Sequence, residues 1–471
     1  MITKKTKIVC TIGPATESEE KLTALIKAGM NVMRLNFSHG DFKEHQGRID
    51  NLKKAVEKTK TPVAVLQDLG GPKIRIGMFK TESVVLKEGA KITLTTDKVE
   101  GDETIVSVNY PNFAKEVKKG HIVFLHDGRK KLEVVDVKGN NVVCKVLIGG
   151  EIKGKRGVNL PDSDLSISSL TDKDRTDLEF GIKNKVDFIA LSFVRRPSDI
   201  VELRTILTAK KSKAKIIAKI ETPQSLSCID QILDLVDGVM VARGDLAIEI
   251  PAEKVPAAQK MLIRKCNEKG IPVITATQML ESMIKAPVPT RAEVSDIANA
   301  ILDGTDAVML SEETTLGDFP VHAVEVMTKV AAQVEGTLQK KQLLDITPNT
   351  ILTSPESVAL SAVKNADRVG AKYLVSFTSS GMSSRLISRH KPTQPIVVFT
   401  PHEVTYRQAV LSWGTYPVMI EKTEDFNKVT QLVRDYFLKA KLAKKGDKIV
   451  MASALPFGKN TGTNMLVVET L

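Results

Sequence analysis

Short apolar runs alternate with helix-period segments through residues 1–70 and 160–340. Because these runs are apolar at consecutive positions, they are typical of strands buried on both faces, as in a parallel sheet covered by helices. Eight such runs, each followed by a helical segment, predict an α/β fold built on a (β/α)8 TIM barrel. The runs cover residues 7–11, 31–35, 63–68, 187–193, 215–221, 238–243, 273–278 and 307–311.

Two further regions depart from this alternation and predict two more domains. Short β-branched stretches at 83–86, 92–96, 122–125 and 132–137 are separated by Gly and Asn turns, with a hairpin tip at Gly139, Asn140 and Asn141. They indicate an all-β, β-barrel-like lid domain inserted after the third barrel strand. Later runs at 373–378, 396–400, 417–420, 448–452 and 465–468 predict a C-terminal α/β sheet domain. The expected domains are therefore barrel parts at 1–71 and 159–342, the insertion at 72–158 and the C-terminal domain at 343–471.

The amino-acid composition narrows the class of protein and its expected location. The 471 residues are 42% apolar and 26% charged, which is typical of a globular protein with several domains. No apolar run reaches the ~18 residues of a membrane span. The N-terminus lacks a secretory signal and the four cysteines lie far apart, so we expect a cytoplasmic protein with reduced thiols. The net charge of +12 comes from scattered lysines with only five Tyr and one Trp, which favours a solvated surface over a nucleic-acid or membrane partner.

Polar side chains follow most of the predicted barrel strands. In such a barrel the active site lies at the C-terminal ends of the strands. A polar residue at one strand end is explained by solvation alone, whereas polar residues at six of eight ends indicate a site. The six ends carry Arg34 with Asn36, Asp68, Lys219 with Glu221, Arg243 with Asp245, Thr277 with Gln278, and Ser311.

The strand around Lys219 gives the most specific chemistry. Alternation places Lys219 and Glu221 on one face, and a lysine after an apolar run needs either that carboxylate or an anionic ligand. Asp245 ends the next strand, and two carboxylates with substrate oxygens and water are a typical way to hold Mg2+. A helix beginning at Gly244 would offer N–H groups to a carboxylate or phosphate. Neither a GxxxxGK[ST] loop nor a GxGxxG after a strand is present.

Several longer motifs together resemble the pyruvate kinase family. They occur in that family's order from residue 7 to about 320, and the expected insertion and C-terminal domain match its layout. The motifs are NVMRLNFSHG (31–40), IAKIE (217–221), MVARGDL (240–246), ATQMLESM (276–283), PTRAEVSD (289–296) and DGTDAVMLS (303–311).

This resemblance implies a Mg2+-dependent transfer of the phosphoryl group from phosphoenolpyruvate to ADP, with Mn2+ as an alternative metal, in the last step of glycolysis. It implies that Lys219 and Arg34 stabilise the transferring group and that Glu221 and Asp245 hold the metal. The substrate carboxylate would bind Gly244, Asp245 and Thr277, and the proton would pass by Thr277 and Ser311. The implied nucleotide-binding residues are Asn36, His39, Arg75 and Arg156.

The implied monovalent-cation site carries the main departure from the family. The resemblance places Asn36, Ser38, Asp68 and the Leu69 carbonyl around potassium. However, Lys73 stands where potassium-dependent members usually have Glu, and Leu69 and Ile76 stand where they usually have Thr. A lysine already supplies a positive charge, so we expect Lys73 to replace potassium and the enzyme not to require K+. The alternative is a lysine that points to solvent.

Other features concern regulation and rate. The loop formed by Thr378, Ser379, Ser380, Gly381 and Ser383 resembles the family's cradle for a phosphorylated effector, although a Ser/Thr-rich helix cap is the simpler alternative. The family is usually a homotetramer. Further departures are Arg156 for a usual Lys, Ala247 for a common Gly, and Glu312 for a Gly, which would place an extra carboxylate near the proton path.

Two other functions would fit parts of the pattern. A metal-dependent aldolase or mutase on the same barrel would share the carboxylates and the anion pocket but would not need the inserted lid, Arg75 or Arg156. A basic nucleic-acid-binding protein on a catalytically dead barrel would be expected to lack Lys219, Glu221, Asp245 or Thr277. All four are present.

Overall fold

The computed structural model describes residues 4–338, 351–456 and 462–471, and its centre is a closed barrel of eight parallel strands. The strand order β1-β16-β15-β14-β13-β12-β3-β2 confirms the predicted (β/α)8 barrel, and all eight predicted strands are present. Their observed bounds are β1 (Lys7–Thr11), β2 (Val32–Asn36), β3 (Ala64–Asp68), β12 (Phe188–Leu191), β13 (Lys215–Ile220), β14 (Gly238–Ala242), β15 (Val273–Ala276) and β16 (Ala307–Leu310).

The two faces of β13 show why the strands are apolar throughout. Ile217 belongs to the cluster inside the barrel, whereas Ile216, Ala218 and Ile220 pack outward against the surrounding helices. Alternation then places the side chains at 215, 217, 219 and 221 on the inner face. One strand therefore carries a lysine at each end of the barrel interior, Lys215 at its start and Lys219 near its carboxyl end.

Helices cover the barrel and begin at residues suited to capping them. Thr171 and Thr290 each form a capping box with the acidic residue three positions later, Asp174 and Glu293 respectively. Short helices follow several strands at the carboxyl ends. The barrel helices are α1 (Glu19–Ala28), α2 (Phe42–Thr59), α4 (Asp172–Lys183), α5 (Pro197–Ala209), α6 (Pro223–Ser227), α7 (Ile229–Leu233), α8 (Arg243–Glu249), α9 (Val255–Lys269), α10 (Arg291–Leu302), α11 (Glu312–Thr315) and α12 (Pro320–Thr337).

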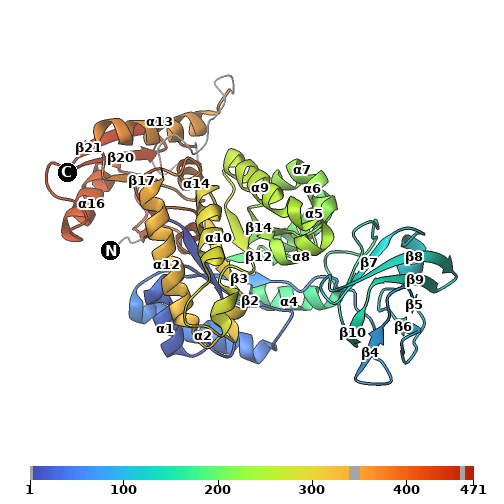
Figure 1. The fold of residues 1–471 in the computed structure, drawn as a ribbon. Coiled ribbons are helices and arrows are strands. Elements are labelled where there is room, and N and C mark those ends of the chain that lie inside the picture. The colour runs from blue at the N-terminus through green and yellow to red at the C-terminus, as the bar shows by residue number, and fades with distance from the viewer. Residues whose placement is uncertain (1–3, 339–350, 457–461) are drawn as a thin grey trace.

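The insertion after β3 is built mainly from strands and projects to one side of the barrel (Figure 1). It contains a two-stranded sheet, β10-β4, and a six-stranded sheet, β11-β7-β8-β9-β5-β6. Gly139 and Asn140 form the turn between β8 and β9, as predicted. Its elements are β4 (Ser83–Leu86), β5 (Lys91–Thr95), β6 (Ile105–Ser107), α3 (Phe113–Glu116), β7 (Ile122–Leu125), β8 (Lys130–Lys138), β9 (Asn141–Ile148), β10 (Gly150–Lys153) and β11 (Val158–Asn159).

The C-terminal domain contains one five-stranded sheet in the order β19-β18-β17-β20-β21 and confirms the predicted α/β architecture. Its expected start at residue 343 lies outside the described residues. None of the helices described is both long and apolar enough to cross a bilayer. The elements are α13 (Ser354–Val369), β17 (Tyr373–Phe377), α14 (Met382–Ser388), β18 (Ile396–Thr400), α15 (Glu403–Gln408), β19 (Thr415–Met419), α16 (Phe426–Lys439), β20 (Lys448–Ser453) and β21 (Met465–Thr470).

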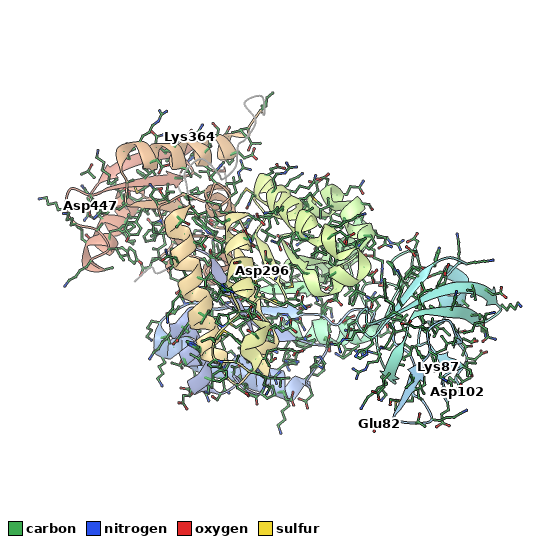
Figure 2. The ribbon with its side chains drawn as sticks, in the orientation of Figure 1. Glu82, Lys87, Asp102, Asp296, Lys364 and Asp447 are labelled. Atoms are coloured by element: carbon green, nitrogen blue, oxygen red, sulfur yellow. The ribbon has the colours of Figure 1, made fainter. Side chains whose placement is uncertain are left out.

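The two added domains lie on opposite sides of the barrel (Figure 1). Figure 2 shows Glu82, Lys87 and Asp102 at the far edge of the insertion, while Lys364 and Asp447 lie in the C-terminal domain. Ion pairs to buried aspartates join the C-terminal domain to residues that precede barrel strands. Lys391 lies 2.9 Å from Asp306, and Arg407 lies 2.9 Å from Asp187. The strand ends opposite these contacts, which carry the predicted active site, are left free to face the insertion.

Candidate active site

Lys219 lies at the centre of a buried charged cluster at the carboxyl ends of the barrel strands. Its Nζ is 3.0 Å from Oε1 of Glu221, 3.3 Å from Oδ1 of Asp68 and 2.7 Å from the hydroxyl of Ser192. Arg34 donates from Nε to Asp68 at 2.7 Å and from Nη1 to Thr11 at 2.7 Å. The sequence left open whether Lys219 pairs with a carboxylate, and in the structure it pairs with two.

The electrostatics of this cluster are set by burial and by opposite charges. Burial alone would lower the pKa of Lys219, but Asp68 and Glu221 raise it above its ordinary value. Burial would raise the pKa of Asp68, yet Lys219 and Arg34 hold it below its ordinary value. Lys219 and Asp68 are therefore charged at neutral pH, and the cluster presents a fixed cation to any anion that enters.

Glu221 has one oxygen suited to a metal ion. Its Oε2 accepts the N–H of Phe193 at 2.7 Å, whereas its buried Oε1 faces only the ammonium of Lys219, at 3.0 Å, among the described residues. Burial, followed by repulsion from Asp245, raises the pKa of Glu221 against the opposing effect of Lys219. A divalent cation bound between Glu221 and Asp245 would offset the cost of burying the Glu221 charge and the repulsion between the two carboxylates. These residues therefore fit a metal that takes further oxygens from substrate and water. Within the described ranges no cluster of three or more His, Cys, Asp or Glu is arranged as a metal site.

Thr277 and Gly244 form a second part of the site. The hydroxyl of Thr277 donates to the Ala276 carbonyl at 2.7 Å and accepts the N–H of Gly244 at 2.9 Å. The N–H that was expected to bind a substrate carboxylate therefore contacts Thr277 in this structure. Thr277 has φ of 69°, a left-handed conformation that costs a β-branched residue energy and is typical of functional sites.

Arg243 holds the strained backbone of Thr277 in place. Its guanidinium donates to the carbonyls of Ala276 at 3.1 Å and Thr277 at 2.7 Å, and it pairs with Asp296 at 2.7 Å. Figure 2 shows Asp296 on α10, in the central part of the molecule. The sequence motif at 289–296 contained Asp296, but reasoning from the sequence assigned it no role.

The environment of Ser311 differs from the expectation. Glu312 is exposed, whereas the adjacent Glu313 is buried and accepts the N–H of Ser311 at 2.6 Å and that of Leu280 at 3.1 Å. Burial raises the pKa of Glu313. The carboxylate that accepts the Ser311 N–H is therefore Glu313, to which the sequence interpretation assigned no role.

The expected nucleotide-binding residues are spread around the junction of barrel and insertion. The side chains of His39 and Arg75 are exposed, and Arg75 donates to the Lys155 carbonyl at 3.1 Å. Arg156 is partly buried, and its Nε has no hydrogen-bond partner among the described residues. Asn36 lies at the end of β2 and accepts the N–H of Ser38 at 3.1 Å. Two of the four residues, Arg75 and Arg156, therefore lie on the segments that link the two domains.

The residues expected around a monovalent cation lie close together. Asn36 is the register partner of Asp68 on the neighbouring strand, and the Leu69 carbonyl accepts the Ser192 hydroxyl at 2.7 Å. The Asp68 carboxylate, however, is already paired with Arg34 and Lys219. Lys73 is exposed and lines the cleft between the barrel and the insertion.

That cleft also contains a contact that sequence reasoning missed. Asn159 on β11 of the insertion donates to Oε1 of Glu249 on α8 at 2.8 Å. Both residues line the cleft together with Lys73 and Asp245. Burial raises the pKa of Glu249 to about 7, with smaller contributions from the charges of Asp245 and Glu221. The insertion is thereby hydrogen-bonded to the short helix that also carries Asp245.

The Ser/Thr-rich loop of the C-terminal domain lines a separate pocket of about 340 Å3. The Thr378 hydroxyl accepts the N–H of Gly381 at 2.9 Å, and Ser383 shares a 2.5 Å hydrogen bond with Thr463. The predicted loop residues Thr378, Ser379, Ser380 and Ser383 all line this pocket. The loop thus presents a surface that a ligand can reach, and its Thr378 hydroxyl holds the residue that precedes α14.

Fold and site together define a class of protein. Eight parallel strands bring a lysine, an arginine and several carboxylates to one end of a barrel, under an inserted β domain. Buried positive charge that is held in place by neighbouring carboxylates is suited to stabilising an anion during group transfer. The chain is a (β/α)8 enzyme for an anionic substrate.

Comparisons with known proteins make this assignment specific. Residues 3–324 match the family model "Pyruvate kinase, barrel domain", and residues 356–469 match "Pyruvate kinase, alpha/beta domain". The chain is 45% identical to a pyruvate kinase of Staphylococcus saprophyticus, over 98% of this chain and 80% of that protein. It is 44% identical to a pyruvate kinase of Geobacillus stearothermophilus, over 99% of this chain and 80% of the relative.

A solved structure gives the same result. The crystal structure of a pyruvate kinase from Cryptosporidium parvum has a TM-score of 0.95 and 37% identity, covering 99% of this chain and 96% of that one. The chain belongs to the pyruvate kinase family. Membership makes it a phosphotransferase, with phosphoenolpyruvate and ADP or ATP as the substrates that the family implies.

Proposed function

We propose that the protein uses Mg2+, or Mn2+ in its place, to transfer the phosphoryl group of phosphoenolpyruvate to ADP as the last step of glycolysis. The observation that supports this most is the cluster of Lys219, Glu221, Asp68 and Arg34. Its cations are suited to stabilising a phosphoryl group, and the buried carboxylate of Glu221 would bind a metal by exchanging the contact of its Oε1 with Lys219. Phosphoryl transfer asks a protein mainly for positioning and positive charge.

Each residue of the cluster takes a role that suits its surroundings. Lys219 and Arg34 stabilise the charge on the phosphoryl and enolate oxygens. Glu221 and Asp245 hold the metal, which supplies Lewis-acid stabilisation of the enolate when bound. The substrate carboxylate binds at Thr277, Gly244 and Asp245, for which the Gly244 N–H exchanges its contact with Thr277.

The last steps concern the proton and the nucleotide. We assign the delivery of H+ to the enolate carbon to a path that includes Thr277 and Ser311, with Glu313 positioning the Ser311 backbone. Asn36, His39, Arg75 and Arg156 bind the nucleotide phosphates. The inserted domain, joined to α8 through Asn159 and Glu249, excludes water from the reacting group so that transfer prevails over hydrolysis.

We further propose that the enzyme does not need potassium. Support comes from the three departures at positions 69, 73 and 76 and from the place of Lys73 in the cleft beside Asp245 and Glu249. The side chain of Lys73 is exposed and flexible, so its ammonium can approach a bound phosphate. There it would supply the positive charge that potassium supplies in potassium-dependent members of the family. The ring of Asn36, Ser38, Asp68 and Leu69 then needs no ion.

Regulation and assembly follow from the same family resemblance. The Thr378–Gly381 loop and its pocket would bind a phosphorylated effector, because the loop offers hydroxyls and backbone N–H groups. A homotetramer in the cytoplasm is the assembly and location that we propose.

A metal titration tests the proposed metal site. Mg2+ is titrated in the pyruvate-forming assay, and Mn2+ binding is followed separately by electron paramagnetic resonance. For Glu221→Gln we expect binding of both metals to weaken by about tenfold or more, because a charged oxygen ligand is lost. Glu253→Gln, an exposed glutamate near α8, is the control. Unchanged Mn2+ binding in Glu221→Gln would remove Glu221 from the metal site.

A further inference from the structure

A small cavity lies between the barrel and the C-terminal domain, away from the active site. Its walls come from the start of β13, from the loop before α14, and from α14 and α15. The open volume is about 10 Å3, close to that of a single water-sized sphere. The residues used below are Lys215, Asp237, Gly381, Ser384, Arg385 and Gln408.

Two cationic side chains, one from each domain, converge on this cavity. A methyl group built on Gly381 would lie 3.5 Å from Nη1 of Arg385 and 3.8 Å from Nζ of Lys215. Nη1 of Arg385 is buried and has no hydrogen-bond partner among the described residues. Lys215 is partly buried, and its ammonium makes no ion pair or hydrogen bond with any residue that the structure describes.

The nearest carboxylate does not neutralise them. Asp237 also lines the cavity, but its Oδ2 already accepts Nη2 of Arg204 at 2.7 Å and the N–H of Ile216 at 3.1 Å. Burial, followed by the charge of Arg385, lowers the pKa of Lys215 to about 7, with Asp237 opposing the change. Burial also lowers the pKa of Arg385. In both residues burial is the main cause, and the charge of Asp237 opposes it.

Isolated buried charge is costly, and proteins remove that cost by pairing it or by neutralising the group. Arg385 cannot lose its proton at physiological pH, so at least one cation stays in the cavity. Two other polar side chains that line the cavity already make hydrogen bonds within the protein. Ser384 donates to the Gly381 carbonyl at 2.9 Å, and Gln408 donates to the carbonyls of Asp187 and Lys213.

We propose that the cavity binds a compact inorganic anion, of halide size, between Lys215 of the barrel and Arg385 of the C-terminal domain. The two unpartnered nitrogens supply the charge, and the volume admits a single atom more readily than a tetrahedral oxyanion. The anion joins two domains by bridging one cation from each. It borders the effector pocket, because Ser380 lines both, but neither Lys215 nor Arg385 lines that pocket.

Crystals of the wild-type protein grown with sodium bromide give the direct test. We expect an anomalous bromide peak within hydrogen-bond distance of both Lys215 Nζ and Arg385 Nη1. Water alone, or no peak, in this cavity overturns the proposal. This test uses no variant and therefore does not depend on how well a substituted protein folds.

Thermal unfolding provides the matching test in solution. Chloride is titrated against gluconate, which is too large for the cavity, at constant ionic strength. We expect the wild-type Tm to rise and saturate with chloride. For Lys215→Met and Arg385→Met the half-saturating chloride concentration should increase by about tenfold or more, because each removes a charge-assisted hydrogen bond.

Two further measurements, the Tm in gluconate alone and the response of a control variant, distinguish anion binding from a general structural role of Lys215 and Arg385. In gluconate alone, neither variant should have a lower Tm than wild type, because each removes an uncompensated cation. Lys213→Met, at an exposed position two residues from Lys215, should keep the wild-type chloride response. An identical chloride response in Lys215→Met overturns the proposal. A response to sodium phosphate that Lys215→Met abolishes, without any response to chloride, overturns the assignment to a halide-sized anion.

Discussion

Nζ of Lys219 lies 3.0 Å from Oε1 of Glu221, two residues further along the chain at the same barrel mouth. This pair joins the cation proposed for the phosphoryl group to the carboxylate proposed for the metal. Because Asp68 and Arg34 extend the network, the charge of Lys219 is held in one place before substrate binds. Such preorganised charge is the largest contribution that many enzymes make to catalysis.

Lys219→Met is therefore expected to lower kcat by about 100-fold or more, the magnitude typical of losing one preorganised electrostatic group. The side chain keeps its length but loses its charge. Pyruvate formation under saturating substrates measures the effect, with circular dichroism as the check on folding. Lys213→Met is the exposed control and should keep wild-type activity. A loss smaller than about tenfold for Lys219→Met would contradict the assigned role.

Asp296→Asn tests whether Arg243 positions Thr277. The substitution removes the charge opposite Arg243, which clamps the carbonyls of Ala276 and Thr277. We expect the KM for phosphoenolpyruvate to rise by about tenfold, in line with the loss of a charged hydrogen bond, while the KM for ADP changes little. Asp318→Asn, in an exposed ion pair with Lys285, serves as the control. Equal increases in both KM values would indicate a general loss of structure instead.

Glu249 predicts a specific pH dependence of stability. Burial raises its pKa to about 7 in the folded protein, so between its ordinary value of 4.5 and about 7 the folded state binds more protons than the unfolded state. Its contribution to stability is therefore fully present below pH 4.5 and is lost as pH rises to 7, by no more than about 3 kcal/mol.

Glu249→Gln keeps an oxygen for Asn159 and removes this titration. The Tm of wild type minus that of the variant, measured from pH 4.5 to 8, should fall across the window and level off above 7. Glu253→Gln, which is exposed, should show no such slope in the same comparison. A flat difference for Glu249→Gln would show that the carboxyl ionises without penalty in the folded protein.

Lys73→Glu should create a requirement for potassium. With glutamate in the cleft, the positive charge proposed to stand in for potassium is lost and a negative charge takes its place. We expect kcat in potassium-free buffer to fall and to recover by about tenfold or more when potassium is added. Lys80→Glu, at an exposed position in the insertion, is the charge-matched control. Recovery of both variants to the same extent would point to a general salt effect.

Much of the fold could be predicted because the barrel strands are buried on both faces and leave a simple apolar pattern. The short strands β6, β10 and β11 could not be predicted, because their stability depends on strands that are distant in the chain. For example, β10 pairs with β4. In the site, strand alternation was enough to relate Lys219 to Glu221. It could not show that Glu313 contacts the Ser311 backbone, because only the turn after β16 brings this carboxylate inward.

The contacts of Asp296 and Glu249 also could not be predicted from the sequence. Each residue lies on a helix whose polar positions look like an ordinary solvated face, and each gains its role from a partner on another element. Arg243 follows β14, and Asn159 belongs to the insertion. A single sequence carries no signal for such pairs, whereas the three-dimensional arrangement makes them evident.

The most direct test of the account is pyruvate formation from phosphoenolpyruvate, ADP and Mg2+ in a buffer with sodium as the only monovalent cation, repeated with potassium. We predict full activity in both buffers, with a change in kcat well below about tenfold. Activity only with potassium would contradict the role proposed for Lys73 while leaving the kinase assignment in place. No pyruvate in either buffer, from protein shown to be folded, would contradict the catalytic role proposed for the Lys219 cluster.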